Sequence, residues 1–277
     1  MDRELVLATL ALPLCGAALL AGSLLRLRLR APTSSRSARA LERHTWARIW
    51  LPLLPAALVL AFLTGWALQE PEDAEVAQPL LVIAAIGCAV IWLRAGTRAI
   101  RALRPASGLA MTSGLLRPRV TIAPSLAAHL DPRALAAVHA HEAAHARHRD
   151  PLRLWLAQLA TDLQWPSQTA RQRFADWRSA LELARDAEAC ESVDGSDLAA
   201  ALIGAAQLGA GSSATVGLLG DSDRAFADRI HRLLEPSPID RAPASRRWIG
   251  VLVMLSLAAA IGAAYGEAIV GWFPGLG

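Results

Sequence analysis

Lysine is absent from this 277-residue chain, and tyrosine and cysteine are scarce, with one and three copies. All 28 basic residues are therefore arginine, a bias that fits nucleotide composition better than function. The net charge of +4 is modest and the arginines gather beside apolar segments, which argues against a nucleic-acid-binding surface. Cys15, Cys88 and Cys190 are scattered without the spacing of metal ligands, so we expect reduced, buried thiols and no disulfide framework.

Apolar residues are abundant by contrast. They make up 54% of the chain, and the mean hydropathy of +0.33 is too high for an ordinary soluble protein. Four apolar runs approach the roughly 20 residues that a helix needs to cross a bilayer. They lie at about 5–25, 49–68, 76–93 and 248–269. We therefore predict a mainly α-helical, polytopic membrane protein, with three transmembrane helices in residues 1–93 and a fourth in residues 248–277.

Charged residues between the apolar runs indicate how the spans are oriented. Arginines crowd the connection after the first run: Arg26, Arg28, Arg30, Arg36, Arg39, Arg43 and Arg48. More arginines follow the third run: Arg94, Arg98, Arg101 and Arg104. The connection at 70–75 is acidic and has no arginine. Because positively charged connections stay in the cytoplasm, we expect both termini outside and residues 94–247 as one cytoplasmic domain.

One motif in this cytoplasmic region carries a recognisable chemistry. It is His141-Glu142-Ala143-Ala144-His145, which has the HExxH spacing of zinc metallopeptidases. On a helix, positions i and i+4 share a face, so His141 and His145 can present imidazole nitrogens to one metal ion. Glu142 then lies beside the metal, where it can act as general base toward a water whose pKa zinc lowers from about 15.7 to about 7. A pattern of five residues also arises by chance. Whether this one binds a metal therefore depends on what the rest of the chain supplies.

A second predicted helix can supply the third metal ligand that the motif lacks. A catalytic zinc site has three protein ligands and an open position for water. Glu182 and Asp186 lie four residues apart on a predicted helix at about 168–191 and therefore share a face. Glu182 is the candidate third ligand, and Asp186 lies behind it as the candidate acceptor of the free N–H of a ligand histidine. The alternative is a solvated charged helix face.

The remaining cytoplasmic region is predicted to contain helices and one hairpin. Two β-like stretches, 109–114 and 119–122, are separated by glycine and proline and form the hairpin. Asp131, followed by proline, is expected to cap the HExxH helix, which ends near Arg149. Asp150, also followed by proline, is expected to cap the next helix in the same way. Further helices are expected at 152–163, 168–191, 197–208 and 224–234.

Seven short segments are informative in combination. They are Gly114-Leu115-Leu116-Arg117-Pro118, the strand at 120–122, the HExxH pentapeptide, Arg149-Asp150-Pro151, Trp165-Pro166, Glu182-Leu183-Ala184-Arg185-Asp186 and Arg229-Ile230-His231-Arg232-Leu233-Leu234-Glu235-Pro236. Together they resemble the BlaR/MecR-type membrane metallopeptidases. Those proteins are bacterial sensor-transducers of the β-lactam-resistance type, whose zinc domain lies on a cytoplasmic loop between the third and fourth transmembrane helices. The resemblance covers nearly the whole chain.

The resemblance implies a gluzincin-like zinc domain on the cytoplasmic face of a bacterial inner membrane. It implies one Zn²⁺ held by His141, His145 and Glu182, with Glu142 as general base and Asp186 behind the ligands. The implied reaction is hydrolysis of a peptide bond in a cytoplasmic protein, commonly a dimeric winged-helix repressor, as part of membrane signalling. No direct contact with nucleic acid is implied.

Two departures from the family bear on function. Sensor members carry a penicillin-binding domain after the fourth helix, whereas 271–277 is all that follows it here. We therefore expect no β-lactam sensing by that route. Arg185 stands where members often have cysteine, at a position that is not expected to touch the metal.

Two alternative functions remain open. One is an HtpX-type quality-control peptidase of the membrane, which shares HExxH and a Glu-x-x-x-Asp helix. The other is a non-catalytic membrane transducer in which zinc only stabilises the domain. The sequence names neither the oxyanion-stabilising residue nor the residues that bind substrate.

Overall fold

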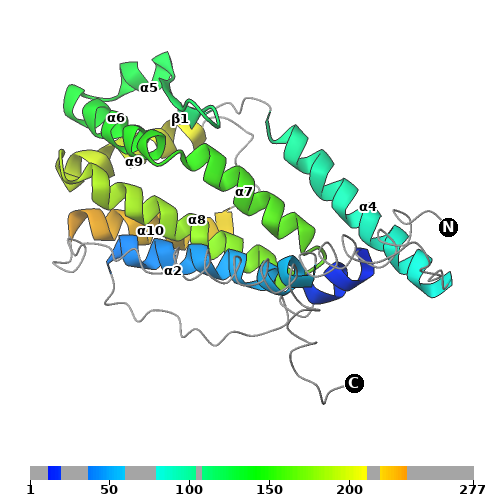
Figure 1. The fold of residues 1–277 in the computed structure, drawn as a ribbon. Helices are drawn as coiled ribbons and strands as arrows, with labels where there is room; N and C mark the ends of the chain where they lie inside the picture. Colours follow the sequence, from blue (N-terminus) through cyan, green and yellow to red (C-terminus); the bar gives the residue numbers. More distant parts are fainter. Residues whose placement is uncertain (1–11, 20–36, 60–78, 104–107, 211–218, 236–277) are drawn as a thin grey trace.

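The computed structural model describes residues 12–19, 37–59, 79–103, 108–210 and 219–235, which are mainly helical with one two-stranded sheet (Figure 1). The predicted mainly α fold with a small hairpin is confirmed at this level. Parts of the first, second and third predicted spans, and the whole of the fourth, lie outside the described residues.

Helix α8, Gln168–Ala189, is the central element of the region that carries the motif. Figure 1 shows α2 (Ala38–Trp50) and α10 (Leu219–Leu234) running along one side of it, with α6 (Pro132–Arg147) and α7 (Asp150–Leu163) on the other. All four helices contact α8. Side chains of α8 can therefore meet residues from four separate parts of the chain.

One apolar cluster joins α2, α7 and α8. Trp177 and Leu181 of α8 are fully buried, and they pack with Ala157 and Ala160 of α7 and with Ile49 of α2. Burial of a large aliphatic side chain such as Leu181 contributes on the order of 1.5–3 kcal/mol. The alanines leave room for the indole between the helices.

A second buried cluster joins α6, the last residue of α8, helix α9 (Gly195–Ala210) and the end of α10. Its buried members include Ala137 of α6, Leu198 of α9 and Leu233 of α10. A Cβ atom on Gly195 would lie 2.2 Å from the carbonyl oxygen of Leu233. Glycine is thus required where the start of α9 meets the backbone of α10.

The start of the HExxH helix is as predicted, but that of the next helix is not. Asp131 caps α6 by accepting hydrogen bonds from the backbone N–H groups of Arg133 and Ala134, both at 2.9 Å. Asp150 does not cap α7. Arg149 occupies the cap position with φ of 52°, and Asp150 is the first helical residue, fully buried. The prediction was wrong because this carboxylate is bound by side chains of neighbouring helices instead of by backbone N–H groups.

The hairpin lies against the HExxH helix. Strands β1 (Ala110–Ser113) and β2 (Arg119–Ile122) pair antiparallel, and both contact α6. Gly114 follows β1 with φ of 93°, and a Cβ atom there would lie 2.7 Å from the carbonyl oxygen of Arg117. The turn therefore needs glycine. A short helix α5, Pro124–His129, connects β2 to α6.

Helix α2 was not predicted, because the arginine-rich connection between the first two apolar runs was interpreted as a loop. From Ala38 to Trp50 that segment is helical, with Ser37 as its N-cap. Glu42 of α2 is buried and accepts hydrogen bonds from Arg153 of α7 and from the indole Nε1 of Trp177 of α8. The connection is thus part of the packed helical domain.

Helix α4, Pro79–Arg101, continues beyond the predicted end of the third span at residue 93. By length and composition, its segment Val82–Arg101 is the one helix among the described residues that could cross a membrane; a four-span arrangement is therefore not established. Of the four arginines expected in the following loop, Arg94, Arg98 and Arg101 lie on the helix, and residue 104 is outside the described residues. Arg98 Nε donates to Asp162 of α7 at 3.0 Å, and Arg94 lies 4.0 Å from the same carboxylate.

Another face of α4 is apolar and exposed. Ile83, Ile86, Val90, Leu93 and Ile100 lie along this stripe, each with more than half of its surface accessible. The helix therefore presents apolar side chains outward, while its arginines contact α7.

Residues 12–19 and 54–59 are also helical and pack near α4. Cys15, Leu19 and Ala56 form a small buried cluster against which Trp92 of α4 packs. A Cβ atom on Gly16 would lie 2.5 Å from the Sγ atom of Cys88, so glycine permits this close contact. The described parts of the first three predicted spans thus lie together.

Candidate metal centre

The two motif histidines point at a common position. The Nε2 atoms of His141 and His145 lie 3.1 Å apart, and both side chains are buried. One helical turn separates the residues on α6, as their spacing requires. Because two ring nitrogens converge, the position between them is suited to a cation.

Glu182 of α8 reaches the same position. Its Oε2 atom lies 3.6 Å from Nε2 of His141 and 3.8 Å from Nε2 of His145. Zinc bonds of about 2.0–2.2 Å in a tetrahedral arrangement place ligand atoms roughly 3.3–3.6 Å apart. Among the described residues, these three form the one group of histidine, cysteine and carboxylate side chains close enough to hold a metal ion. Two histidine nitrogens and one carboxylate oxygen are a donor set that could hold a metal ion such as zinc, and about a third of the Glu182 side chain remains exposed.

Each histidine has its other ring nitrogen against a carboxylate. Nδ1 of His145 lies 2.9 Å from Oδ2 of Asp150, and Nδ1 of His141 lies 3.0 Å from Oδ1 of Asp186, although this second contact is poorly aligned for a hydrogen bond. Such carboxylates hold the proton on Nδ1 and leave Nε2 free to bind a metal. Asp150 was not among the predicted site residues, although it lies only five residues after His145.

Arginines neutralise both outer carboxylates. Arg185 donates two hydrogen bonds to Asp150, one of them from Nη2 at 3.1 Å, and Arg153 donates a third, also at 3.1 Å. Arg229 of α10 donates from Nε and Nη2 to the two oxygens of Asp186, each at 2.8 Å. Arg185 does not touch the candidate ligands, as expected from the sequence.

The electrostatics of the centre favour bound positive charge. Burial alone disfavours a charged imidazole, but Asp150 and Glu182 outweigh it and raise the pKa of His145 to about 9. Asp186 and Glu182 likewise raise the pKa of His141 against the effect of burial. Although burial opposes it, the two histidines and an arginine hold the pKa of Glu182 well below its usual range. A divalent cation would satisfy the same carboxylates.

Glu142 lies next to the ligands and faces the hairpin. The hydroxyl of Thr112 on β1 is 2.7 Å from Oε2 of Glu142 and 2.8 Å from its backbone oxygen. Thr112 can therefore hold the carboxylate by donating a hydrogen bond to it. The sequence offered no signal for Thr112 beyond its place in a β-like stretch.

Other residues near the motif have different contacts. His139 is exposed, and Nε2 of His148 lies 2.8 Å from Glu188. Burial, with added effects of Asp186 and Asp194, raises the pKa of Cys190 to about 11, which fits an unreactive thiol.

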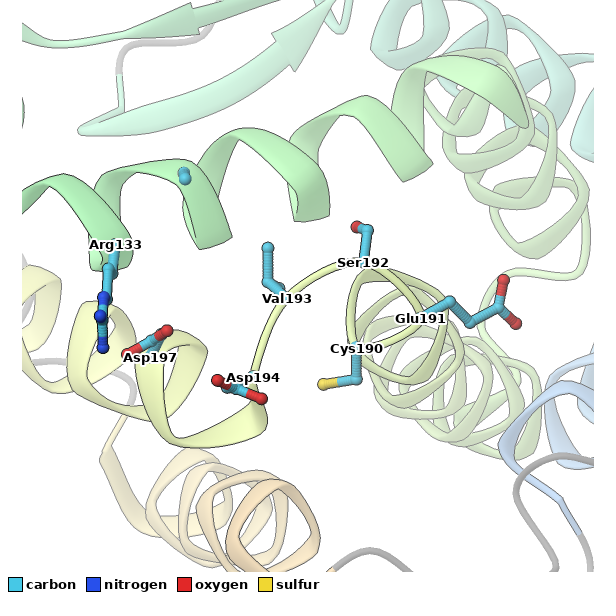
Figure 2. Close-up of a pocket in the computed structure, with 8 residues that line it drawn as sticks. Arg133, Cys190, Glu191, Ser192, Val193, Asp194 and Asp197 are labelled. Carbon is cyan, nitrogen blue, oxygen red and sulfur yellow. The ribbon is translucent and has the colours of Figure 1, made fainter.

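A separate, open depression of about 420 Å³ lies between the start of α6 and the turn from α8 to α9. Figure 2 shows Arg133 of α6 facing Asp197 and Asp194 across it, with Cys190 at the end of α8. No residue of the HExxH motif lines it, so it is distinct from the metal centre.

No protein-family profile, curated protein or solved structure matches this chain, and its function therefore rests on the chemistry of the site.

Proposed function

We propose that this chain is an integral membrane zinc endopeptidase that hydrolyses peptide bonds of a cytoplasmic protein. The observation that carries the proposal is the convergence of His141, His145 and Glu182 at distances that one zinc ion can span, with Glu142 next to the first ligand. Zinc, when bound, supplies a Lewis acid that polarises a carbonyl and acidifies a water.

The chain's own residues have separate tasks in this reaction. Asp150 keeps Nδ1 of His145 protonated and its ring oriented, and Asp186 places a carboxylate 3.0 Å from Nδ1 of His141. Glu142 accepts the proton of the attacking water and returns it to the leaving amine. Thr112 holds the carboxylate of Glu142 on the hairpin side.

The number of ligands favours catalysis over a structural role for zinc. Structural zinc sites are closed by four protein ligands, whereas catalytic sites keep an open position. Within the described part of the chain, three side chains converge. The partial exposure of Glu182 also supports access from solvent.

The membrane part of the proposal comprises four spans, both termini outside, and the peptidase domain on the cytoplasmic face of a bacterial inner membrane. The exposed apolar stripe of α4 supports the third span. The arginine-rich connections support the orientation.

The proposed substrate is a transcriptional repressor, in line with the resemblance to BlaR/MecR-type peptidases. An HtpX-type enzyme would instead degrade misfolded membrane proteins. The two are distinguished by offering purified enzyme a winged-helix repressor encoded beside its gene and a heat-denatured membrane protein. Cleavage of the repressor at one position supports the regulatory role, whereas general cleavage of the denatured protein supports quality control.

The zinc peptidase proposal is tested with Glu142→Gln in detergent. We expect about one zinc per chain in both the wild type and the variant, and a loss of proteolysis of at least 100-fold in the variant, because the general base is removed. Glu235→Gln is the matched control, since Glu235 is exposed at the end of α10. Unchanged proteolysis would remove Glu142 from the mechanism, and a wild type without zinc would overturn the metal centre.

A further inference from the structure

Arg229 is the one side chain of α10 that enters the metal centre in the described structure. Two of its nitrogens donate to Asp186 at 2.8 Å, and Nη1 lies 3.3 Å from Oε2 of Glu182. The side chain is mostly buried, with 17% of its surface exposed. Arg229 thus contacts both carboxylates of α8 that face the histidines.

The atoms involved are the same ones that face the histidines. Oδ1 of Asp186 accepts from Nη2 of Arg229 and lies 3.0 Å from Nδ1 of His141. Oε2 of Glu182 lies near Nη1 of Arg229 and also faces both Nε2 atoms. A planar guanidinium with three engaged nitrogens fixes the orientation of both carboxylates at once, which a flexible ammonium cannot do.

Electrostatics require a cation at this position. Glu182 and Asp186 lie one turn apart on α8, and like charges at that spacing repel each other. Burial disfavours the charge of Arg229, but Asp186 and Glu182 more than compensate and raise its pKa. Without the guanidinium, Asp186 would lose its main partner and Glu182 would lose its restraint toward the histidines.

Helix α10 packs against α8 and α9. Among its described side chains, Leu233 alone is buried, in the cluster with Ala137 and Leu198. The helix leads along the chain toward the last apolar run at 248–269.

We propose that Arg229 is a positioning residue for the zinc ligands and that docking of α10 sets the zinc affinity of the centre. The proposal deepens the proposed zinc peptidase function and rests on it. It assigns to α10 a regulatory part: the centre binds zinc tightly when Arg229 is seated and weakly when α10 is displaced.

The first experiment measures zinc affinity by competition with a chromophoric chelator. We expect Arg229→Ala to bind zinc about 10–100-fold more weakly than the wild type, the range typical of residues behind metal ligands. Arg229→Lys should show an intermediate loss, because it restores the charge but not the bidentate contact. The matched control is Arg232→Ala, which removes the same charge from α10 and should change the affinity less than twofold.

A spectroscopic readout separates positioning from general damage. With Co²⁺ in place of zinc, Arg229→Ala should shift or weaken the d–d absorption bands, while Arg232→Ala should leave them unchanged. Circular dichroism checks that both variants remain folded. Equal zinc affinities and equal spectra for Arg229→Ala and Arg232→Ala would overturn the proposal.

The second experiment tests the coupling to α10. Leu233→Ala loosens the docking of α10 without touching the ligands, so we expect severalfold weaker zinc binding. In a protein that already carries Arg229→Ala, Leu233→Ala should weaken zinc binding little further, because Leu233 acts on the centre through Arg229. Additive losses would show that α10 docking acts by another route. A wild type that binds no zinc would defeat the zinc peptidase proposal itself, whereas zinc binding that is indifferent to Arg229 would defeat this inference alone.

Discussion

At the scale of single residues, the hydroxyl of Thr112 determines where the carboxylate of Glu142 lies. We expect Thr112→Val to lower kcat about tenfold, because a hydrogen bond to a charged group is worth roughly 1.5–3 kcal/mol. Thr112→Ser, which keeps the hydroxyl, should retain most activity. Zinc content should be unchanged in both variants, since Thr112 does not contact the ligands. Steady-state kinetics and metal analysis check this.

The control for Thr112 is Thr121→Val on the neighbouring strand, where the side chain is exposed. It makes the same chemical change in the hairpin away from Glu142. Equal losses of activity in the Thr112→Val and Thr121→Val variants would mean that the hairpin, and not the hydroxyl, matters.

The sequence could predict the candidate ligands but not all of their partners. His141, His145, Glu182 and Asp186 follow from helical periodicity, which is local. Arg229 could not be placed, because its contact with Asp186 depends on how two helices 43 residues apart in sequence pack together. Long-range docking of this kind leaves no periodic signal.

Asp150 was missed for a different reason. A carboxylate before proline at the start of a helix is a common cap signal. The left-handed conformation of Arg149 instead turns Asp150 back toward His145 and Arg185. The sequence does not show whether Asp150 caps the next helix or contacts His145 and Arg185.

At the scale of elements, α2 is fixed to the domain by a buried carboxylate. Glu42 accepts hydrogen bonds from Arg153 and Trp177, whereas Glu191 pairs with Arg39 of α2 at the exposed edge of the same interface. We expect Glu42→Ala to lower the stability of the domain by about 1–3 kcal/mol, because it leaves the buried indole Nε1 of Trp177 without its acceptor and removes one of the two carboxylates that pair with Arg153.

Glu191→Ala is the comparison for Glu42→Ala. Exposed ion pairs are worth about 0–1 kcal/mol, so its effect on the unfolding midpoint should be small. Denaturant unfolding can be followed by tryptophan fluorescence, to which this interface contributes Trp46 and Trp177 of the nine tryptophans in the chain. Equal destabilisation by the two variants would contradict a dominant role for Glu42.

The elements that the sequence predicted well are those with local signals. Asp131 marks the start of α6, and Gly114 marks the turn of the hairpin. Helix α2 and the end of α4 were missed because arginine was taken as a mark of loops beside the membrane. In the structure, Arg94 and Arg98 lie on a helix whose polar face contacts Asp162.

At the scale of the whole molecule, the exposed stripe of α4 is the surface proposed to face lipid. Val90 lies in the middle of it, with 61% of its surface exposed. We expect Val90→Arg to reduce membrane insertion, because arginine near the centre of a span costs about 2.5–3.5 kcal/mol. Val90→Leu should insert normally.

Insertion is measured with the α4 segment, residues 79–103, fused to a soluble reporter, as the fraction that stays in membranes after alkaline carbonate extraction. Val90→Arg protein that remains fully in the membrane fraction would argue that this stripe faces another protein surface instead of lipid. Activity of the Val90→Leu variant serves as the reference for correct assembly.

The order of the site along the chain has a consequence for biosynthesis. His141, His145 and Asp150 leave the ribosome together, but Glu182 and Asp186 follow only with α8, and Arg229 later still. If Arg229 sets the zinc affinity as proposed, a nascent chain shorter than α10 holds the metal weakly. We therefore expect the protein to acquire its zinc late in synthesis, shortly before the last apolar run emerges for insertion.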